Sequence, residues 1–272
     1  MCLNNGHNEI DKPEMKPEVN VSADETELVA QLRRYLNEKL TYLLEQNGIV
    51  SIGVSGGSMP KVFTKAFLET TEELKNLNWK RIRIFMVDER NVEKDDDDSN
   101  LGAYLKLFPQ ELHEIFIPFT CYRDARHTAH GYEMNLRKYL FPEQNGTFAR
   151  FDVVFLGVGP DGHTASLFPG KERLDKVTEL HWVAAINDSP KPPASRITLT
   201  MQCLQNAKNV AFIITGIQKA EIVRGIWNRE LRYPAAQARP YNEKLTLFLD
   251  EEAAKGIPER DSSDSESPPP FE

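Results

Sequence analysis

The stretch FDVVFLGVGPDGHTASLFPG, residues 151–170, is the most informative part of the chain for its fold. Its first six residues form a short, mainly apolar run, which is typical of a strand that is buried on both faces of a sheet. A glycine-rich loop follows at once, and Pro169-Gly170 then closes the segment. A buried strand that runs directly into such a loop is typical of a parallel α/β sheet, in which ligands bind outside the carboxyl ends of the strands.

Outward from this stretch, apolar runs alternate with amphipathic helical patterns. Further strands are predicted at 49–54, 81–87, 182–186, 210–215 and 245–249. A first helix is expected between Ser22, as its N-cap, and Gly48, and other helices at about 61–75, 125–140, 201–207 and 218–230. This alternation predicts an α/β fold with a doubly wound, mainly parallel sheet and helices on both faces.

The pattern covers residues 21–257, which we expect to form a single α/β domain. The chain has 272 residues, 40% of them hydrophobic, enough to bury a sizeable core. Residues 1–20 are polar and show no periodicity, and residues 258–272 form an acidic tail rich in serine and proline. Both ends are therefore expected to be disordered.

Composition and charge exclude several classes of function. The net charge is −8, and the sequence shows no cluster of basic residues that would form a nucleic-acid-binding face. No apolar run approaches the roughly 18 to 20 residues that span a membrane, and the opening MCLNNGHNEIDKPEMKPE does not resemble a secretory signal. The cysteines, Cys2, Cys121 and Cys203, are too far apart for a disulfide framework or a zinc cluster. We expect a cytoplasmic protein, a monomer or a weak homo-oligomer.

The loop after the strand at 49–54 has three interpretations. Residues 53–57 match G-x-S-x-G, the turn that presents the nucleophilic serine of α/β hydrolases. That fold places several strands before its nucleophile, whereas one helix and one strand precede Ser55. We favour an anion cradle, in which the backbone of Ser55, Gly56, Gly57 and Ser58 approaches a phosphate at the start of a helix, over the hydrolase turn or a tight turn without function.

The loop after the strand at 151–156 also matches a known motif. Residues 157–162 satisfy G-x-G-x-x-G, the dinucleotide-binding fingerprint. Pro160 removes a backbone donor, and Pro169-Gly170 ends the segment before a helix of the required length, so a dinucleotide site is disfavoured. We interpret the loop instead as a device that presents His163 to a ligand, because an imidazole with a pKa near 6.5 suits proton transfer at neutral pH.

Basic residues follow several of the predicted strands. Surface bases usually serve solubility, but four of them on strand-exit loops beside a glycine cradle predict a phosphate site: Arg90, Lys191, Arg196 and Lys219. We expect no metal site. His127 and His130 lack partners at ligand spacing, and the acidic run at 95–98 lacks the glycine and the terminal glutamate of a calcium loop.

Five blocks of sequence now stand in a recognisable order. They are VSGGS at 54–58, VDERNV at 87–92 with Ser99-Asn100 after it, FLGVGPDGHTASLFPG at 155–170, SPKPPASRITLT at 189–200 and TGIQKA at 215–220. Together they resemble the 6-phosphogluconolactonase family, over nearly all of residues 25–250. The histidine block and the SPKPP to RITLT block are the specific parts, since SGGS alone is weak.

This resemblance implies an enzyme of the oxidative pentose phosphate pathway that hydrolyses 6-phospho-D-glucono-1,5-lactone to 6-phosphogluconate without a metal or an organic cofactor. It also implies a Rossmann-like fold, as in sugar-phosphate isomerases, glucosamine-6-phosphate deaminases and coenzyme A transferases. By the same resemblance, His163 is the catalytic base and Arg90 binds the phosphate beside the cradle. Arg196 and Lys219 are further phosphate ligands, and Asp161 orients the base.

Two alternatives remain open. A sugar-phosphate deaminase or isomerase on the same fold could use the same cradle and histidine loop, although the residues TASLFP after His163 favour the lactonase. A non-catalytic sugar-phosphate-binding protein is the second alternative. The histidine and the arginines that such a protein would be expected to lose are all present.

Overall fold

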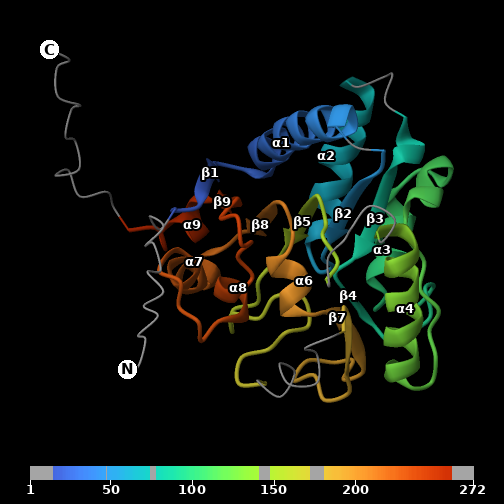
Figure 1. The fold of residues 1–272 in the computed structure, drawn as a ribbon. Coiled ribbons are helices and arrows are strands. Elements are labelled where there is room, and N and C mark those ends of the chain that lie inside the picture. The colour runs from blue at the N-terminus through green and yellow to red at the C-terminus, as the bar shows by residue number, and fades with distance from the viewer. Residues whose placement is uncertain (1–14, 47, 74–77, 141–147, 172–180, 259–272) are drawn as a thin grey trace, which may run out of the picture.

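The computed structural model describes residues 15–46, 48–73, 78–140, 148–171 and 181–258. Its central feature is a six-stranded sheet in which every neighbouring pair is parallel (Figure 1). The strand order is β1 (Glu18–Ser22), β9 (Leu245–Asp250), β8 (Val210–Ile214), β5 (Val153–Leu156), β2 (Val50–Val54) and β3 (Ile82–Met86). The predicted parallel α/β sheet is therefore confirmed.

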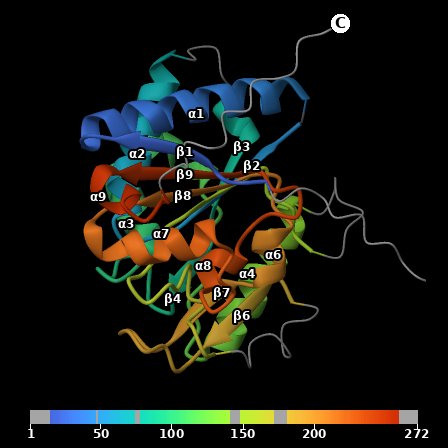
Figure 2. The ribbon, with the colours of Figure 1, turned by 90° about the vertical axis from the view of Figure 1, so that its left-hand side faces the viewer.

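Helices cover both faces of this sheet. Helix α1 (Glu25–Gln46) lies over one face and α7 (Ala220–Trp227) over the other (Figure 2). The remaining helices are α2 (Met59–Glu73), α3 (Asn100–Leu107), α4 (Ala125–Leu140), α6 (Met201–Gln205), α8 (Pro234–Gln237) and α9 (Glu251–Ala254), and short 3₁₀ turns lie at η1 (Trp79–Arg81), η2 (Gln110–Ile115) and η4 (Ile217–Lys219). Within the described ranges, every helix is too short or too polar to cross a lipid bilayer.

A second, three-stranded antiparallel sheet packs against α4. Its order is β4 (Asp88–Arg90), β7 (Arg196–Leu199) and β6 (Val183–Ile186). Residues 182–186 were predicted as a strand of the mainly parallel sheet and Arg90 was placed on a strand-exit loop. Both expectations were wrong, because β6 runs antiparallel to β7 and Arg90 belongs to β4. A four-residue apolar run carries no information on its direction, and its partner β7 begins at Arg196, which was also placed on a strand-exit loop.

The N-terminal boundary also needs correction. Residues 18–20 were expected to be disordered, but they belong to β1, which pairs with β9 from Glu18↔Thr246 to Ser22↔Asp250. An edge strand is held by backbone hydrogen bonds, so it needs no long apolar run. Ser22 is not the N-cap of α1, because its hydroxyl donates to Gln31 and Asp24 accepts from the N–H of Glu27. Residues 1–14 and 259–272 lie outside the described residues.

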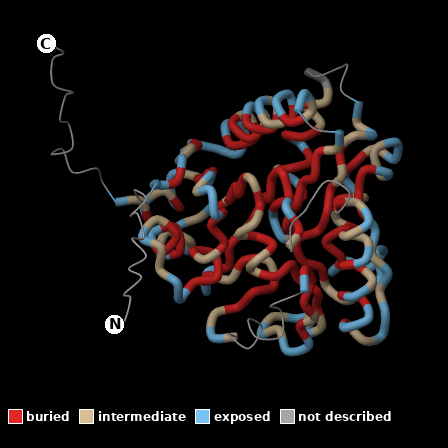
Figure 3. Tube along the Cα trace, in the orientation of Figure 1, coloured by how far each residue is buried: buried red, intermediate tan, exposed pale blue. Residues whose placement is uncertain are grey.

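The core lies between the large sheet and its helices, where all of its strands except the edge strand β1 are almost wholly buried (Figure 3). Phe155 of β5 packs edge to face against Tyr35 of α1 and Phe63 of α2. Beside it, Asp152 is buried and accepts from the N–H and hydroxyl of Ser51, at 2.8 and 2.9 Å. These contacts fix β2 and β5 side by side and so bring the loops that follow them together.

Candidate active site

A cavity of about 550 Å³ opens at the carboxyl ends of β2, β5 and β8. The loops of the small sheet complete its wall. The cavity is lined by nine of the ten predicted site residues: Ser55, Gly56, Gly57, Ser58, Arg90, His163, Lys191, Arg196 and Lys219. The tenth, Asp161, does not line the cavity but is hydrogen-bonded to His163. The structure thus brings the predicted residues into one place.

The Ser55 to Ser58 turn joins β2 to α2 and requires its two glycines. A side chain on Gly56 would place its Cβ 1.8 Å from Oδ1 of the buried Asn100, and Gly57 has a φ of +69°. The Ser55 carbonyl accepts from the Tyr104 hydroxyl at 2.7 Å, which holds the turn. The Ser55 hydroxyl is buried without a hydrogen-bond partner among the described residues, so no histidine activates it as a nucleophile.

Strand β4 supplies the cavity with alternate residues. Asp88 and Arg90 line it, while Glu89 between them points away and accepts from the N–H groups of Asn100 and Leu101 at the start of α3, both at 2.7 Å. Burial raises the pKa of Glu89 to about 7, and these backbone hydrogen bonds oppose that shift. The two-residue period of a strand therefore explains how the DER motif serves both the cavity and α3.

His163 is held against Asp161 in the loop after β5. Nδ1 of the imidazole is hydrogen-bonded to Oδ1 of Asp161, and the ring lies on Phe168 with 4.8 Å between centroids. Gly159 is needed here, because a Cβ at this position would fall 2.0 Å from the His163 ring. Gly162 adopts a φ of +82° and packs against Tyr233. The loop is thus shaped to bring the histidine to the cavity.

The environment lowers the pKa values of both members of this pair. Burial lowers the pKa of His163 below its ordinary range, and the charge of Lys191 acts in the same direction, while Asp161 opposes both. For Asp161, burial alone would raise the pKa, but the hydrogen bond with His163 and the charges of His163 and Lys191 outweigh it. The imidazole is accordingly neutral and the carboxylate ionised at neutral pH.

Asp88 is a cavity residue that the sequence analysis did not single out. It is 6% exposed, and its Oδ2 accepts from the hydroxyl of Ser166 at 2.7 Å. Burial raises its pKa, which the Ser166 hydrogen bond and the charges of Arg90 and Arg196 oppose. Ser166 follows Ala165, whose φ of +50° is strained for a residue with a side chain. Asp88 stood in the VDERNV block, and strand alternation with Arg90 was the signal that could have revealed it.

Two other basic residues that line the cavity, Arg196 and Lys219, donate hydrogen bonds to backbone carbonyls. Arg196 is 5% exposed and donates to the carbonyls of Pro193, Lys191 and Pro192. Lys219 donates to the carbonyl of Val158, and burial lowers its pKa, with the charge of Lys191 acting in the same direction. The two side chains are thereby bound to the backbone of the loops that form the cavity wall.

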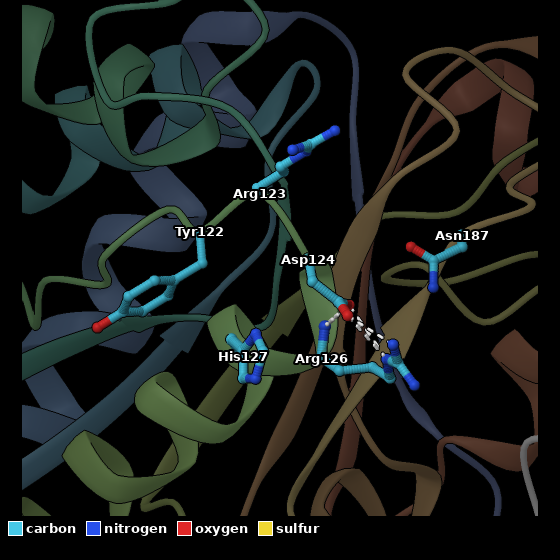
Figure 4. A pocket seen from close by; sticks show the side chains of 6 residues that line it. All are labelled: Tyr122, Arg123, Asp124, Arg126, His127 and Asn187. Carbon is cyan, nitrogen blue, oxygen red and sulfur yellow. Dashed lines mark hydrogen bonds and ion pairs between the residues drawn. The ribbon is translucent and has the colours of Figure 1, made fainter.

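A second hollow of about 780 Å³ lies on the surface at the start of α4 (Figure 4). Figure 4 shows Arg126 turned onto Asp124, to which it is bonded at 2.6 Å, so its charge is neutralised. His127 lines this hollow, and no group of three metal-ligating side chains occurs anywhere in the described part of the chain. The residues that line this hollow are mostly exposed, so the cavity lined by His163 and Asp88 is the better candidate for an active site.

The chain is similar to known proteins over most of its length. Residues 23–247 match the family model described as glucosamine-6-phosphate isomerases/6-phosphogluconolactonase. A putative 6-phosphogluconolactonase of Caenorhabditis elegans is 68% identical over the full length of both chains. The 6-phosphogluconolactonase of Rattus norvegicus is 35% identical over 87% of this chain and 92% of its own.

Among solved structures, 6-phosphogluconolactonase from Trypanosoma brucei superimposes with a TM-score of 0.77 and 28% identity, covering 89% of this chain and 99% of its own. Sequence model, relatives and fold therefore lead to one conclusion, that this chain belongs to the glucosamine-6-phosphate isomerase/6-phosphogluconolactonase family.

Proposed function

We propose that this protein hydrolyses 6-phospho-D-glucono-1,5-lactone to 6-phosphogluconate, the second step of the oxidative pentose phosphate pathway, with His163 as the base that activates water. The observation that carries this proposal is one cavity lined both by a histidine that is hydrogen-bonded to Asp161 and by a glycine turn with basic side chains. The names of the relatives supply the substrate.

The hydrogen bond to Asp161 sets the tautomer of His163. An ionised carboxylate accepts the proton of Nδ1, which leaves the lone pair on Nε2. Within the described residues Nε2 has no hydrogen-bond partner, so it is available to a water molecule in the cavity. A neutral imidazole is the form that accepts a proton, and burial favours that form here.

The reaction then needs no covalent intermediate. Water attacks C1 of the lactone while Nε2 takes its proton, and the resulting oxyanion collapses with cleavage of the bond between C1 and the ring oxygen. The protonated His163 returns its proton to that oxygen, which leaves as the free hydroxyl of the product. Asp161 stabilises the imidazolium between the two steps.

The phosphate of the substrate is expected at the Ser55 to Ser58 turn. The N–H groups of Gly57 and Ser58 have no acceptor within the described residues, and they precede the N-terminus of α2, where an anion is stabilised. Arg90 lines the same cavity, with Arg196 and Lys219 as further positive charges. Binding energy from this end would position the distant lactone carbon against His163.

The test is hydrolysis of freshly prepared lactone by the purified protein, corrected for spontaneous opening. His163→Ala should lower kcat by about 10² to 10⁴, the usual contribution of general base catalysis. His130→Ala, which removes an exposed histidine of α4, is the matched control and should retain full activity. A His163→Ala variant with near wild-type turnover would refute the base, and ammonia release from glucosamine 6-phosphate in place of lactone hydrolysis would establish the deaminase instead.

A further inference from the structure

Lys191 lies beside the catalytic pair and not merely in the cavity wall. Its Nζ is 3.3 Å from Nδ1 of His163 and 3.5 Å from Oδ1 of Asp161. The ammonium group therefore contacts both atoms of the hydrogen bond that orients the base. Lys191 was predicted as a phosphate ligand, because a sequence pattern does not place this side chain against the histidine loop.

Hydrogen bonds to the backbone of Lys191 hold the residue in this position. The carbonyl of Lys191 accepts from the Ser189 hydroxyl at 2.8 Å and from Nη2 of the buried Arg196 at 3.1 Å. The N–H of Lys191 donates to the Ser189 hydroxyl at 3.2 Å. Its side chain is 41% exposed, so the ammonium keeps part of its hydration while it reaches His163.

We propose that Lys191 is a positioning residue that keeps His163 in its neutral, proton-accepting form, rather than a ligand of the substrate phosphate. A cation at this distance disfavours a second proton on the imidazole. It also offsets part of the negative charge of Asp161, which by itself would stabilise the imidazolium. This inference rests on the proposed role of His163 as the base.

The other groups around His163 are consistent with this role. The charged groups that act on the imidazole are Asp161, Lys191 and the buried Asp88, and the two carboxylates both favour protonation. Phe168, on which the ring lies, is uncharged. Burial and Lys191 oppose the two carboxylates and hold the pKa of His163 below its ordinary value. Lys191 is thus the cation that contacts the Asp161–His163 pair and opposes protonation of the imidazole.

The sign of the expected change follows directly. Lys191→Met keeps most of the aliphatic stem and removes the charge, so the pKa of His163 should rise, by about 0.5 to 1 unit for a charge in a largely hydrated position. The acid limb of the kcat/KM profile should move upward by the same amount. Activity lost at low pH should then return as the pH is raised.

The decisive measurement is an NMR titration of the His163 ring in the free protein, with kcat and KM measured across the same pH range. Lys191→Arg should restore the wild-type pKa. Lys219→Met removes another cation of the same cavity that does not contact His163, and it should leave the His163 pKa in place. A Lys191→Met variant with an unshifted or lowered pKa, or with a raised KM at every pH and no other change, would overturn the proposal.

The titration uses no substrate, so it separates this inference from the proposed reaction. If the lactone were not hydrolysed, the titration would still show whether Lys191→Met shifts the His163 pKa. If the lactone were hydrolysed but the pKa did not move, the proposed function would stand and the role of Lys191 would fall.

Discussion

The hydrogen bond between Asp161 and His163 allows the loss of kcat in Asp161→Asn to be predicted. The substitution keeps the size of the side chain and removes its charge. An asparagine can also turn its amide nitrogen toward Nδ1, which would favour the tautomer that carries its proton on Nε2, where the base needs a lone pair. Both effects weaken His163 as a base and as the imidazolium that follows.

The magnitude comes from the geometry. A hydrogen bond to a charged group contributes about 1.5 to 3 kcal/mol. Asp161 is 38% exposed and His163 18%, so solvent screens part of this energy and the lower part of the range applies. A loss of about 1.5 to 2 kcal/mol from the transition state corresponds to a fall in kcat of about 10- to 30-fold.

The pH dependence of kcat/KM provides a second, independent test of this prediction. Asp161 raises the pKa of His163, so its removal should move the acid limb of kcat/KM to lower pH, opposite to the shift expected for Lys191→Met. Initial rates of lactone hydrolysis measured between about pH 5 and 9, around the ordinary pKa of histidine, would show both effects. An unchanged kcat, or an acid limb that moves upward, would refute the reasoning.

Three further predictions follow from the same structure. Gly56→Ala should destabilise the protein by about 1 to 3 kcal/mol and raise KM, because the added Cβ would overlap Asn100. The control is Gly131→Ala in α4, where the added Cβ meets only an ordinary contact with Tyr122. Urea denaturation and steady-state kinetics of both variants test this prediction. Arg90→Ala should lower kcat/KM by about 10- to 150-fold through the loss of a charged phosphate contact, and an equal value for the wild type and the variant would argue against Arg90 as a ligand. Removal of residues 1–22 should lower the free energy of unfolding by roughly 2 to 5 kcal/mol, since β9 loses its ladder with β1, and a truncated protein with unchanged stability in urea would contradict that pairing.

Much of the fold and of the site followed from one rule, that polar residues after buried parallel strands meet at one edge of a sheet. The cradle at Ser55 to Ser58, His163 and Lys219 all follow strands of the large sheet, so their convergence was predictable. Arg90 and Arg196 reach the same cavity from the small antiparallel sheet, where the prediction was right for a different structural reason.

The remaining features depend on contacts between segments far apart in the sequence. Asp88 is hydrogen-bonded to Ser166, and Lys191 contacts His163 from a different loop. The β1 to β9 pairing joins residues with no apolar signature of their own. Oligomeric state and cellular compartment stay predictions, because they depend on surfaces and signals that the fold leaves open.

The position of β1 has a consequence for the order of events during synthesis. β2, β3 and β5 leave the ribosome early and can pair with one another, but β1, made before them all, finds its partner only when β9 has been made, 228 residues later between Glu18 and Thr246. Closure of such a long loop is slow and unfavourable in entropy. β1, the first of the described strands, is therefore the last of them to join the sheet, and until then β8 or β9 presents an unpaired edge.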